Sequence, residues 1–427
     1  MPAVAEIPVI LMLVGLTAYV VLGGADFGAG LWELTARGAR GKALRDHTHR
    51  AMAPVWEANH VWLIFVLTVC WTAYPTAFSS IASTLSIPLF IAAVGIILRG
   101  ASYALRAGTD TPREEGALSL LFVASSLLTP FALGTMVGGI ASGRIPVGNA
   151  AGDEITSWLN PTSLLIGALA VVTSAYLAGV YLAGDATRMG SRDVADAFRR
   201  RAIVAGLVAG ALALAGPFVL RSDARELYDG LTSGAGLVAL LISVVAGAAT
   251  LALVAGRRFE PARLSAAVAV AAIVAGWGLA QEPTFLPGLT IEEAAASDAT
   301  ITAVLVAIAA GALILVPSLA FLFRLVLTGR FDPAAPLKVE EGAAGATPSA
   351  RAATTAQATP ANEVDPSDGV RPKSRPRAAA AVSATFLALG AVVTFVSDNL
   401  LRGAGVTLML AGAIVLFTQL AALDEDV

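Results

Sequence analysis

Several polar side chains stand inside long apolar stretches of this sequence, and the first is an aspartate. Asp26 lies in VVLGGADFGAGLWEL, and an acid within a membrane-spanning helix is costly enough to mark a functional candidate. Gly23 and Gly30 stand three residues before it and four after it, so the three residues share one helical face. Small residues there let a neighbouring helix approach and keep the carboxylate within protein. Asp26 is then either a structural group bonded to a neighbouring helix or a protonatable group that lines a proton or water path.

A second polar group opens the next apolar stretch, in APVWEANHVWLIF. Trp56 and Glu57 precede His60 by four and three residues, a spacing that places them in one helical sector, and Asn59 flanks them. Two plainer interpretations stay open. Trp56 and Trp62 are of a residue type enriched at membrane interfaces, and Glu57 is an acid that the helix dipole favours near a helix start.

The third candidate is Arg99, near the end of the apolar stretch in IILRGASYALR. Its side chain could snorkel to the membrane surface, which would be a structural role. The topology set out below, however, places Asp26, Glu57 and Arg99 on the same side of the bilayer at similar depth. An arginine near two carboxylates would hold at least one of them ionised. This convergence favours a proton inlet that faces the cytoplasm.

The elements that must position these residues are predicted to be membrane-spanning helices. Hydrophobic residues make up 56% of the 427 residues and charged residues 14%, whereas soluble domains carry about a quarter charged residues. A helical span needs about 20 apolar residues. We predict nine spans before residue 330, at 7–34, 52–73, 80–104, 117–140, 161–184, 202–221, 231–255, 263–281 and 300–325.

The loops between these spans predict the orientation, because Lys and Arg gather on the cytoplasmic side. The loops after spans 2, 4, 6 and 8 contain only two basic residues, Arg144 and Arg225, whereas the other loops are rich in them. This difference places the N-terminus outside and the C-terminus in the cytoplasm. No cleavable signal is expected, since Glu6 stands where a basic segment would lie and the first apolar stretch is too long. The loops after spans 1, 3, 5 and 7 hold Arg37, Arg40, Lys42, Arg45, Arg50, Arg106, Arg113, Arg188, Arg192, Arg199, Arg200, Arg201, Arg257, Arg258 and Arg263.

The chain after residue 330 differs in composition. Residues 331–377 are rich in Ala, Pro, Thr and Ser, which predicts a disordered cytoplasmic linker. Two further apolar stretches, about 378–397 and 403–422, predict a transmembrane hairpin within 378–427. The expected protein is therefore an all-α polytopic membrane protein with a nine-span domain at 1–330, a linker and a C-terminal hairpin.

The sequence also excludes several kinds of chemistry. It has three histidines, and His47 and His49 lie in a basic loop, whereas a haem–copper oxidase core needs several intramembrane histidines. No CxxCH haem attachment, Walker motif or zinc spacing occurs, so we expect this chain alone to bind no cofactor and no metal. The single cysteine, Cys70, lies in an apolar run and is interpreted as a buried small hydrophobe. No basic stripe interleaved with aromatics suggests nucleic-acid binding.

The motifs GADFGAGLWEL and APVWEANHVWLIF, together with Arg99, resemble the most recognisable segment of subunit II of the cytochrome bd-type quinol oxidases. The resemblance extends to PFALGTMVGGIASGRIP, to WLNPTSLLIG and to the region 289–325, so it covers about residues 1–330. It implies the family fold, a nine-helix core of two four-helix bundles plus one peripheral helix. The hairpin would be an extra element.

The resemblance also implies a heterodimer in the bacterial cell membrane. The partner, subunit I, would carry haem b, haem d and the quinol site, and the pair would oxidise quinol from the quinone pool and reduce oxygen to water. In the family, residues matching Asp26, Trp56, Glu57 and Arg99 are associated with a proton path from the cytoplasm toward that partner.

Two departures from the family pattern affect the proton path. The family often has an acid where Gly23 stands, so one relay group is expected to be absent. His60 replaces a glutamine-like residue, and Glu57 stands where aspartate is common, which keeps the acid but changes its reach.

The leading hypothesis is an enzyme subunit without its own redox centre, which braces subunit I and conducts protons or oxygen. Its candidate path residues are Asp26, Glu57, Arg99, Trp56, Asn59 and His60. The alternative from another class is a proton-coupled secondary transporter, for which intramembrane acids and broken helices are also expected. A third is a purely structural assembly protein.

Overall fold

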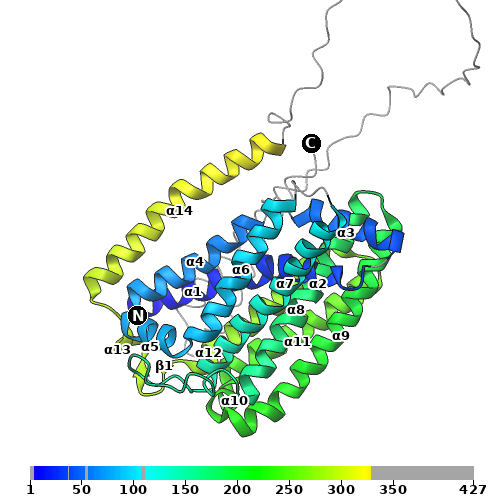
Figure 1. Ribbon diagram of the computed structural model, residues 1–427. Coiled ribbons are helices and arrows are strands. Elements are labelled where there is room, and N and C mark those ends of the chain that lie inside the picture. The colour runs from blue at the N-terminus through cyan, green and yellow to red at the C-terminus, as the bar shows by residue number, and fades with distance from the viewer. Residues whose placement is uncertain (1–3, 37, 53–55, 107–110, 328–427) are drawn as a thin grey trace, which may run out of the picture.

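Helices form most of the computed structural model, which describes residues 4–36, 38–52, 56–106 and 111–327. This confirms the expected all-α polytopic class; the predicted linker and C-terminal hairpin lie outside these residues. The elements (Figure 1) are η1 Val4–Glu6, α1 Ile7–Ala18, η2 Tyr19–Gly23, α2 Gly24–Glu33, α3 Gly38–Met52, α4 Trp56–Ala73, α5 Pro75–Thr84, α6 Ser86–Arg106, α7 Pro112–Ala141, α8 Pro161–Arg188, α9 Arg192–Asp223, α10 Arg225–Leu231, α11 Gly234–Ala255, α12 Phe259–Gln281, β1 Thr284–Leu286, β2 Leu289–Thr290, α13 Ile291–Ala294 and α14 Asp298–Leu327.

The described part of the chain contains 8 helices long and apolar enough to cross a membrane. Each overlaps one of the predicted spans. The remaining predicted span, 52–73, falls on α4, in which the fully described part Asn59–Ala73 forms a shorter apolar helix. The predicted count of nine spans and the division into two four-helix bundles therefore stay predictions.

The first span contains a π-helical turn, η2, between α1 and α2. The N–H of Gly24, which follows this turn, contacts the carbonyl of Tyr19 five residues earlier. Single π turns inside helices are rare and often mark functional sites. At the end of this turn, a Cβ on Gly23 would first meet the Tyr19 ring of its own helix, at 3.1 Å, so the expected approach of a neighbouring helix at Gly23 is not confirmed.

The predicted third span, 80–104, is wrong at its start because two helices meet there. α5 ends at Thr84 and α6 begins at Ser86, and Leu85 between them has φ −98° and ψ 27°. Pro88 accounts for the break, since it has no N–H to donate to the Thr84 carbonyl and its ring would collide with that carbonyl in a continuous helix.

Two basic segments that we expected in loops are helical, and one loop contains strands. α3 occupies the first basic loop, and α9 begins at Arg192, well before the predicted start at 202. Hydropathy detects only the apolar part of a helix, whereas hydrogen bonding within the helix allows it to continue into water. β1 and β2 pair antiparallel between α12 and α13, an element that an all-α prediction omitted.

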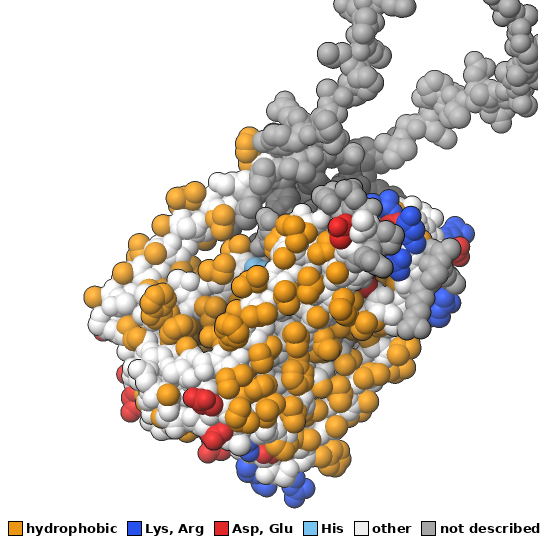
Figure 2. Space-filling model, in the orientation of Figure 1, with side chains coloured by type: hydrophobic (Ala, Val, Ile, Leu, Met, Phe, Trp, Pro, Cys, Tyr) orange, Lys and Arg blue, Asp and Glu red, His pale blue; other side chains and the backbone are white. Residues whose placement is uncertain are grey.

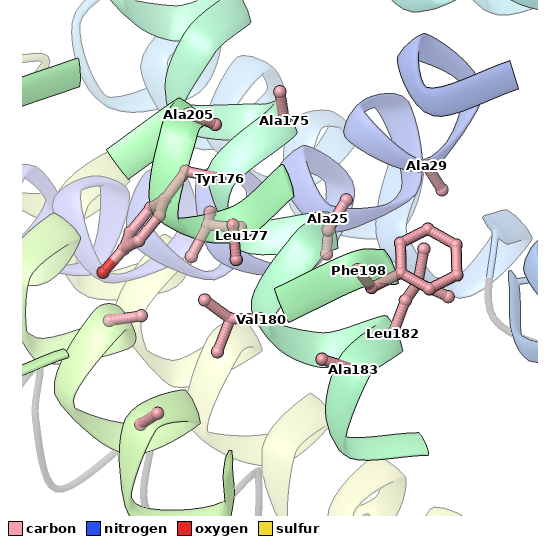
Figure 3. Close-up of a cluster of buried hydrophobic side chains, with 14 of the residues drawn as sticks. Ala25, Ala29, Ala175, Tyr176, Leu177, Val180, Leu182, Ala183, Phe198 and Ala205 are labelled. Carbon is pink, nitrogen blue, oxygen red and sulfur yellow. The ribbon is translucent and has the colours of Figure 1, made fainter. Parts of the chain in front are cut away.

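The largest buried cluster joins α2 to α8, α9 and α12, and small residues dominate it. Figure 3 shows residues of this cluster, with Ala25 and Ala29 on α2, Ala175 and Leu177 on α8, and Phe198 on α9. A Cβ on Gly28 would lie only 1.8 Å from the Ser174 carbonyl oxygen. Helices in lipid associate through such close backbone contacts, since burial of apolar surface adds little there.

The lateral surface of the protein is apolar, as a bilayer requires. In Figure 2 hydrophobic side chains cover the sides of the helices, and Lys, Arg, Asp and Glu gather toward the two ends. α14 is peripheral: it contacts α4 and η1, and most of its side chains between residues 298 and 315 are exposed. Figure 1 shows it diverging from the other helices.

Candidate functional site

A fully buried ion pair between Asp26 and Arg99 forms the centre of the site. Arg99 Nε donates to Asp26 Oδ2 at 2.7 Å, and Nη2 donates to Oδ1 at 2.7 Å. The same Nη2 also donates to the backbone carbonyl of Asp26. Both side chains are 0% exposed. The alternative in which Arg99 snorkels to the surface is therefore wrong, because its guanidinium is bound within the protein.

Two further polar groups complete the coordination of this pair. Arg99 Nη1 donates to Ser126 Oγ at 2.8 Å, and the Tyr103 hydroxyl donates to Asp26 Oδ1 at 3.0 Å. Aromatic rings surround the guanidinium: its Cζ lies 4.8 Å from the Phe27 ring centroid and 4.3 Å from that of Phe122. A buried charge is tolerated only when it is paired and hydrogen-bonded in this way.

Close packing between α2 and α7 brings these groups together. A Cβ on Gly30 would lie 2.0 Å from Ser126 Oγ, so only glycine leaves room for the serine that binds Arg99. This confirms the expectation that Gly30 is a point where a neighbouring helix approaches. Gly95 on α6 has a similar role, because a Cβ there would lie 2.2 Å from Thr129 Oγ1 of α7.

The residues predicted on the next span line one side of the ion pair. The Trp56 ring stacks on Tyr103 with centroids 5.2 Å apart and meets His60 edge-on at 6.1 Å. His60 also stacks on Phe27 at 5.9 Å. Trp56 and His60 therefore share a sector, as their spacing predicted, and Trp56 is a site residue as well as an aromatic residue near the helix start.

Of the two other residues predicted on this span, the structure describes the side chain of Asn59 but not that of Glu57. Asn59 is buried, and its Nδ2 donates to the Leu22 carbonyl in the π turn at 3.3 Å. Glu57 belongs to α4 by its backbone, but its side chain lies outside the described residues. Its predicted place beside Trp56 and His60 therefore stays a prediction.

Sequence reasoning missed several residues that contact this site. Tyr103 follows Arg99 by four residues and so shares its helical face, a signal that was available. Ser126 gave no such signal, because its contact depends on how α7 packs against α2. His49 and Glu33 were also missed: the His49 Nε2 lies 2.5 Å from Glu33 Oε1, and the His49 ring contacts those of Tyr103 and Phe122.

Among the described residues, no group of three or more His, Cys, Asp or Glu side chains is placed so that it could hold a metal ion. The arrangement of the pair instead suits proton transfer or structural bracing. It presents a carboxylate held by arginine and tyrosine, next to a histidine whose ring nitrogens are buried without a hydrogen-bond partner among the described residues.

Comparison with known proteins gives the site its context. The family model for cytochrome bd terminal oxidase subunit II matches residues 4–326. This chain belongs to that family. The match extends over both N-terminal motifs and all the site residues named above, and it confirms the resemblance drawn from the sequence.

Two relatives come from Bacillus subtilis (strain 168). The first, a "Putative cytochrome bd menaquinol oxidase subunit II", is 22% identical over 217 residues, which is 50% of this chain and 61% of the relative. The second, "Cytochrome bd ubiquinol oxidase subunit 2", is 27% identical over 127 residues, 30% of this chain and 37% of the relative. The matched segments thus span less than two thirds of these relatives.

A solved structure agrees with the family assignment over a longer stretch. A chain of "The structure of bd oxidase from Geobacillus thermodenitrificans" matches with 25% identity and a TM-score of 0.61, covering 76% of this chain and 99% of that chain. Together with the apolar helices, family membership makes this a multi-pass membrane protein. It also favours an oxidase subunit over the alternative of a secondary transporter.

Proposed function

We propose that this chain is the subunit of a cytochrome bd-type oxidase complex that braces a haem-bearing subunit I and conducts protons to it from the cytoplasm. The complex would oxidise a membrane quinol and reduce oxygen to water, with haem b and haem d in the partner. The names of the two relatives specify different quinols, menaquinol and ubiquinol. We therefore propose a membrane quinol as the substrate class, without choosing between these two.

The observation that carries the proposal is the fully buried Asp26–Arg99 pair within a family member of this kind. An acid and an arginine inside a bilayer are expensive, and such residues usually serve a pathway. A pair used only for bracing could be replaced by apolar residues at little loss of stability. The presence of both charges supports a role in which the Asp26 carboxylate exchanges protons and Arg99 holds that carboxylate in position.

The proposed path continues from Asp26 toward α4. Beyond the ion pair lie His60 and Tyr19, whose rings are 6.0 Å apart. Within the described residues, neither the His60 nitrogens nor the Tyr19 hydroxyl has a hydrogen-bond partner. Buried polar groups of this kind are places where a proton carrier can bind. Glu57 and Asn59 are proposed as further members of the path on α4.

The direction of this path decides how much energy the complex conserves. Moving one charge against the membrane potential stores about 2.3 kcal/mol per 100 mV. If protons for oxygen reduction enter on the cytoplasmic side, turnover contributes to the potential, which is why the orientation of the chain matters for the proposal.

Copurification tests the proposal most directly. We expect a tagged form of this chain, expressed with its genetically adjacent subunit I, to retain that subunit in detergent. The complex should show the optical bands of haems b and d and consume oxygen with a quinol, while the chain expressed alone should show none of these bands. Stoichiometric haem in the isolated chain, or purification without any partner, would contradict the assignment.

Reporter fusions test the side on which the path opens. We expect a reporter fused after Arg50 or Arg201 to be cytoplasmic and one after Asp153 to be external, because basic segments stay on the cytoplasmic side. The measurement is a paired phosphatase and fluorescent-protein assay at each site. The reverse pattern would place the ion pair near the external face and remove the cytoplasmic inlet.

A further inference from the structure

We propose that the Glu33–His49 pair loads protons from the cytoplasm onto the path that leads to Asp26. This inference rests on the proposed proton function, and it assigns the first step to Glu33, which lies near the end of the first motif, and to His49, which lies outside both motifs. The pair joins the end of a spanning helix, α2, to the short basic helix α3 that follows it.

The two members of the pair differ in their access to water. The Glu33 side chain is 1% exposed, whereas that of His49 is 20% exposed. His49 Nε2 lies 2.5 Å from Glu33 Oε1, and Ser119 Oγ of α7 donates to the other carboxylate oxygen at 3.0 Å. The buried acid therefore contacts a partly exposed histidine, a type of side chain that commonly transfers protons in proteins.

The pair also lies next to the ion-pair site. The edge of the His49 ring meets Tyr103, with centroids 6.4 Å apart, and the Tyr103 hydroxyl donates to Asp26. Glu33 follows Asp26 by seven residues on α2, about two helical turns or 10 Å. The described charged and titratable residues of the helices packed around the pair include Asp26 on α2, Arg99 and Tyr103 on α6, and Glu114 and Glu115 on α7, with Arg45, Asp46 and Arg50 on α3 itself.

The chemistry of loading is a simple proton transfer. A cytoplasmic acid gives its proton to the imidazole of His49, and its conjugate base remains in solution. The imidazolium is stabilised by the Glu33 carboxylate, and the proton then leaves toward Asp26 along the side where Tyr103 lies. No electron or heavy atom is exchanged.

The same helix α3 offers a matched control. His47 stands two residues before His49 but faces the other way: its Nε2 donates to the Leu182 carbonyl at 3.2 Å, and its ring packs on Phe198. Burial lowers the pKa of His47, so its neutral form is favoured. A substitution there changes a histidine of the same helix whose described contacts, with Leu182 and Phe198, lie outside the proposed path.

Chemical rescue tests the proposal in the complete oxidase complex, reconstituted in vesicles. We expect His49→Ala to lower oxygen consumption and cytoplasmic proton uptake by about tenfold or more, the scale of lost acid–base catalysis. Added imidazole should restore much of that loss, because it fits the space left by the side chain. Glu33→Gln should lower both rates to a similar extent, and imidazole should not restore them. His47→Gln should retain the wild-type rates. Haem spectra confirm assembly in each case.

The outcomes separate this inference from the function on which it rests. If His49→Ala assembles and turns over at the wild-type rate, or falls without any imidazole rescue, while Asp26→Asn is impaired, the loading role is wrong and the proton function stands. If Asp26→Asn also keeps wild-type turnover, the proton function fails and the loading role fails with it. If His49→Ala does not assemble, His49→Gln replaces it: a wild-type rate and pH profile would overturn the proposal, and a rate loss that deepens with rising pH would support it.

Discussion

Asp26→Asn is expected to lower the free energy of unfolding of the subunit by about 3–5 kcal/mol, because it leaves the buried guanidinium of Arg99 without its counter-charge. The asparagine keeps the shape of the side chain but cannot neutralise a group that is 0% exposed. The expected result is less assembled complex at a given expression level and a lower midpoint of thermal inactivation. Both are measured by the haem absorbance of the purified membranes.

A double replacement separates bracing from proton transfer at the same position. Asp26→Leu combined with Arg99→Met removes both charges, and apolar residues of similar volume often restore stability after such an exchange. If the pair only braces the helices, assembly and oxygen consumption should recover together. If Asp26 carries protons, assembly should recover while oxygen consumption stays at the level of the single variant.

An exposed ion pair supplies the control for these variants. Arg257 Nη2 lies 3.0 Å from Asp196 at the end of the helices, and the two side chains are 58% and 29% exposed. Asp196→Asn should change stability by less than about 1 kcal/mol, since solvent screens the interaction. An effect of Asp26→Asn no larger than that of Asp196→Asn would show that the buried pair contributes little.

Gly28→Ala is expected to have the second largest effect, and it acts through packing alone. The new methyl group would lie 1.8 Å from the Ser174 carbonyl oxygen, which is backbone and cannot rotate away. α2 and α8 must then separate, and the hydrogen bond from Trp32 Nε1 to the Ala175 carbonyl, 3.0 Å long, would be lost. We expect a loss of about 1–3 kcal/mol or more, measured as a lower thermal midpoint of the complex.

The matched control is a glycine in a spanning helix that faces open space. Gly210 on α9 has nothing within 4 Å of the position of a Cβ. Gly210→Ala should therefore be neutral or slightly stabilising, because alanine favours a helix over glycine. Equal losses for the two variants would mean that α2 and α8 do not approach as closely as described.

The centre of the site could be predicted from sequence because polar residues in apolar stretches are few and topology fixes their depth. That reasoning brought Asp26 and Arg99 to the same level, and the ion pair confirms it. It did not reveal that Arg99 faces inward, because snorkelling and burial give the same sequence pattern. Ser126 could not be predicted, since its contact depends on the relative rotation of two helices that no local spacing encodes.

In the fold, too, features encoded by a local sequence pattern could be predicted, whereas others could not. Hydropathy located the spans, since a bilayer demands long apolar runs. It did not locate α3, because a helix outside the bilayer needs no apolar run and its residues looked like a basic loop. The break at Leu85 was available in principle from Pro88, whose effect on the preceding turn is general.

The π-helical turn at Tyr19–Gly23 has a consequence for comparing relatives of this chain. Such a turn holds one residue more than an α-helical turn, so converting it to an α-helix without removing a residue would rotate everything after it by about 100° around the helix axis. Asp26 would then point away from Arg99 although the span kept almost the same length. Conversely, a relative whose acid stands one position earlier or later can present it to the same arginine by losing or moving the turn. In an alignment, a gap of one residue at this place therefore marks the loss of the turn, while the two halves of the helix keep their relative facing.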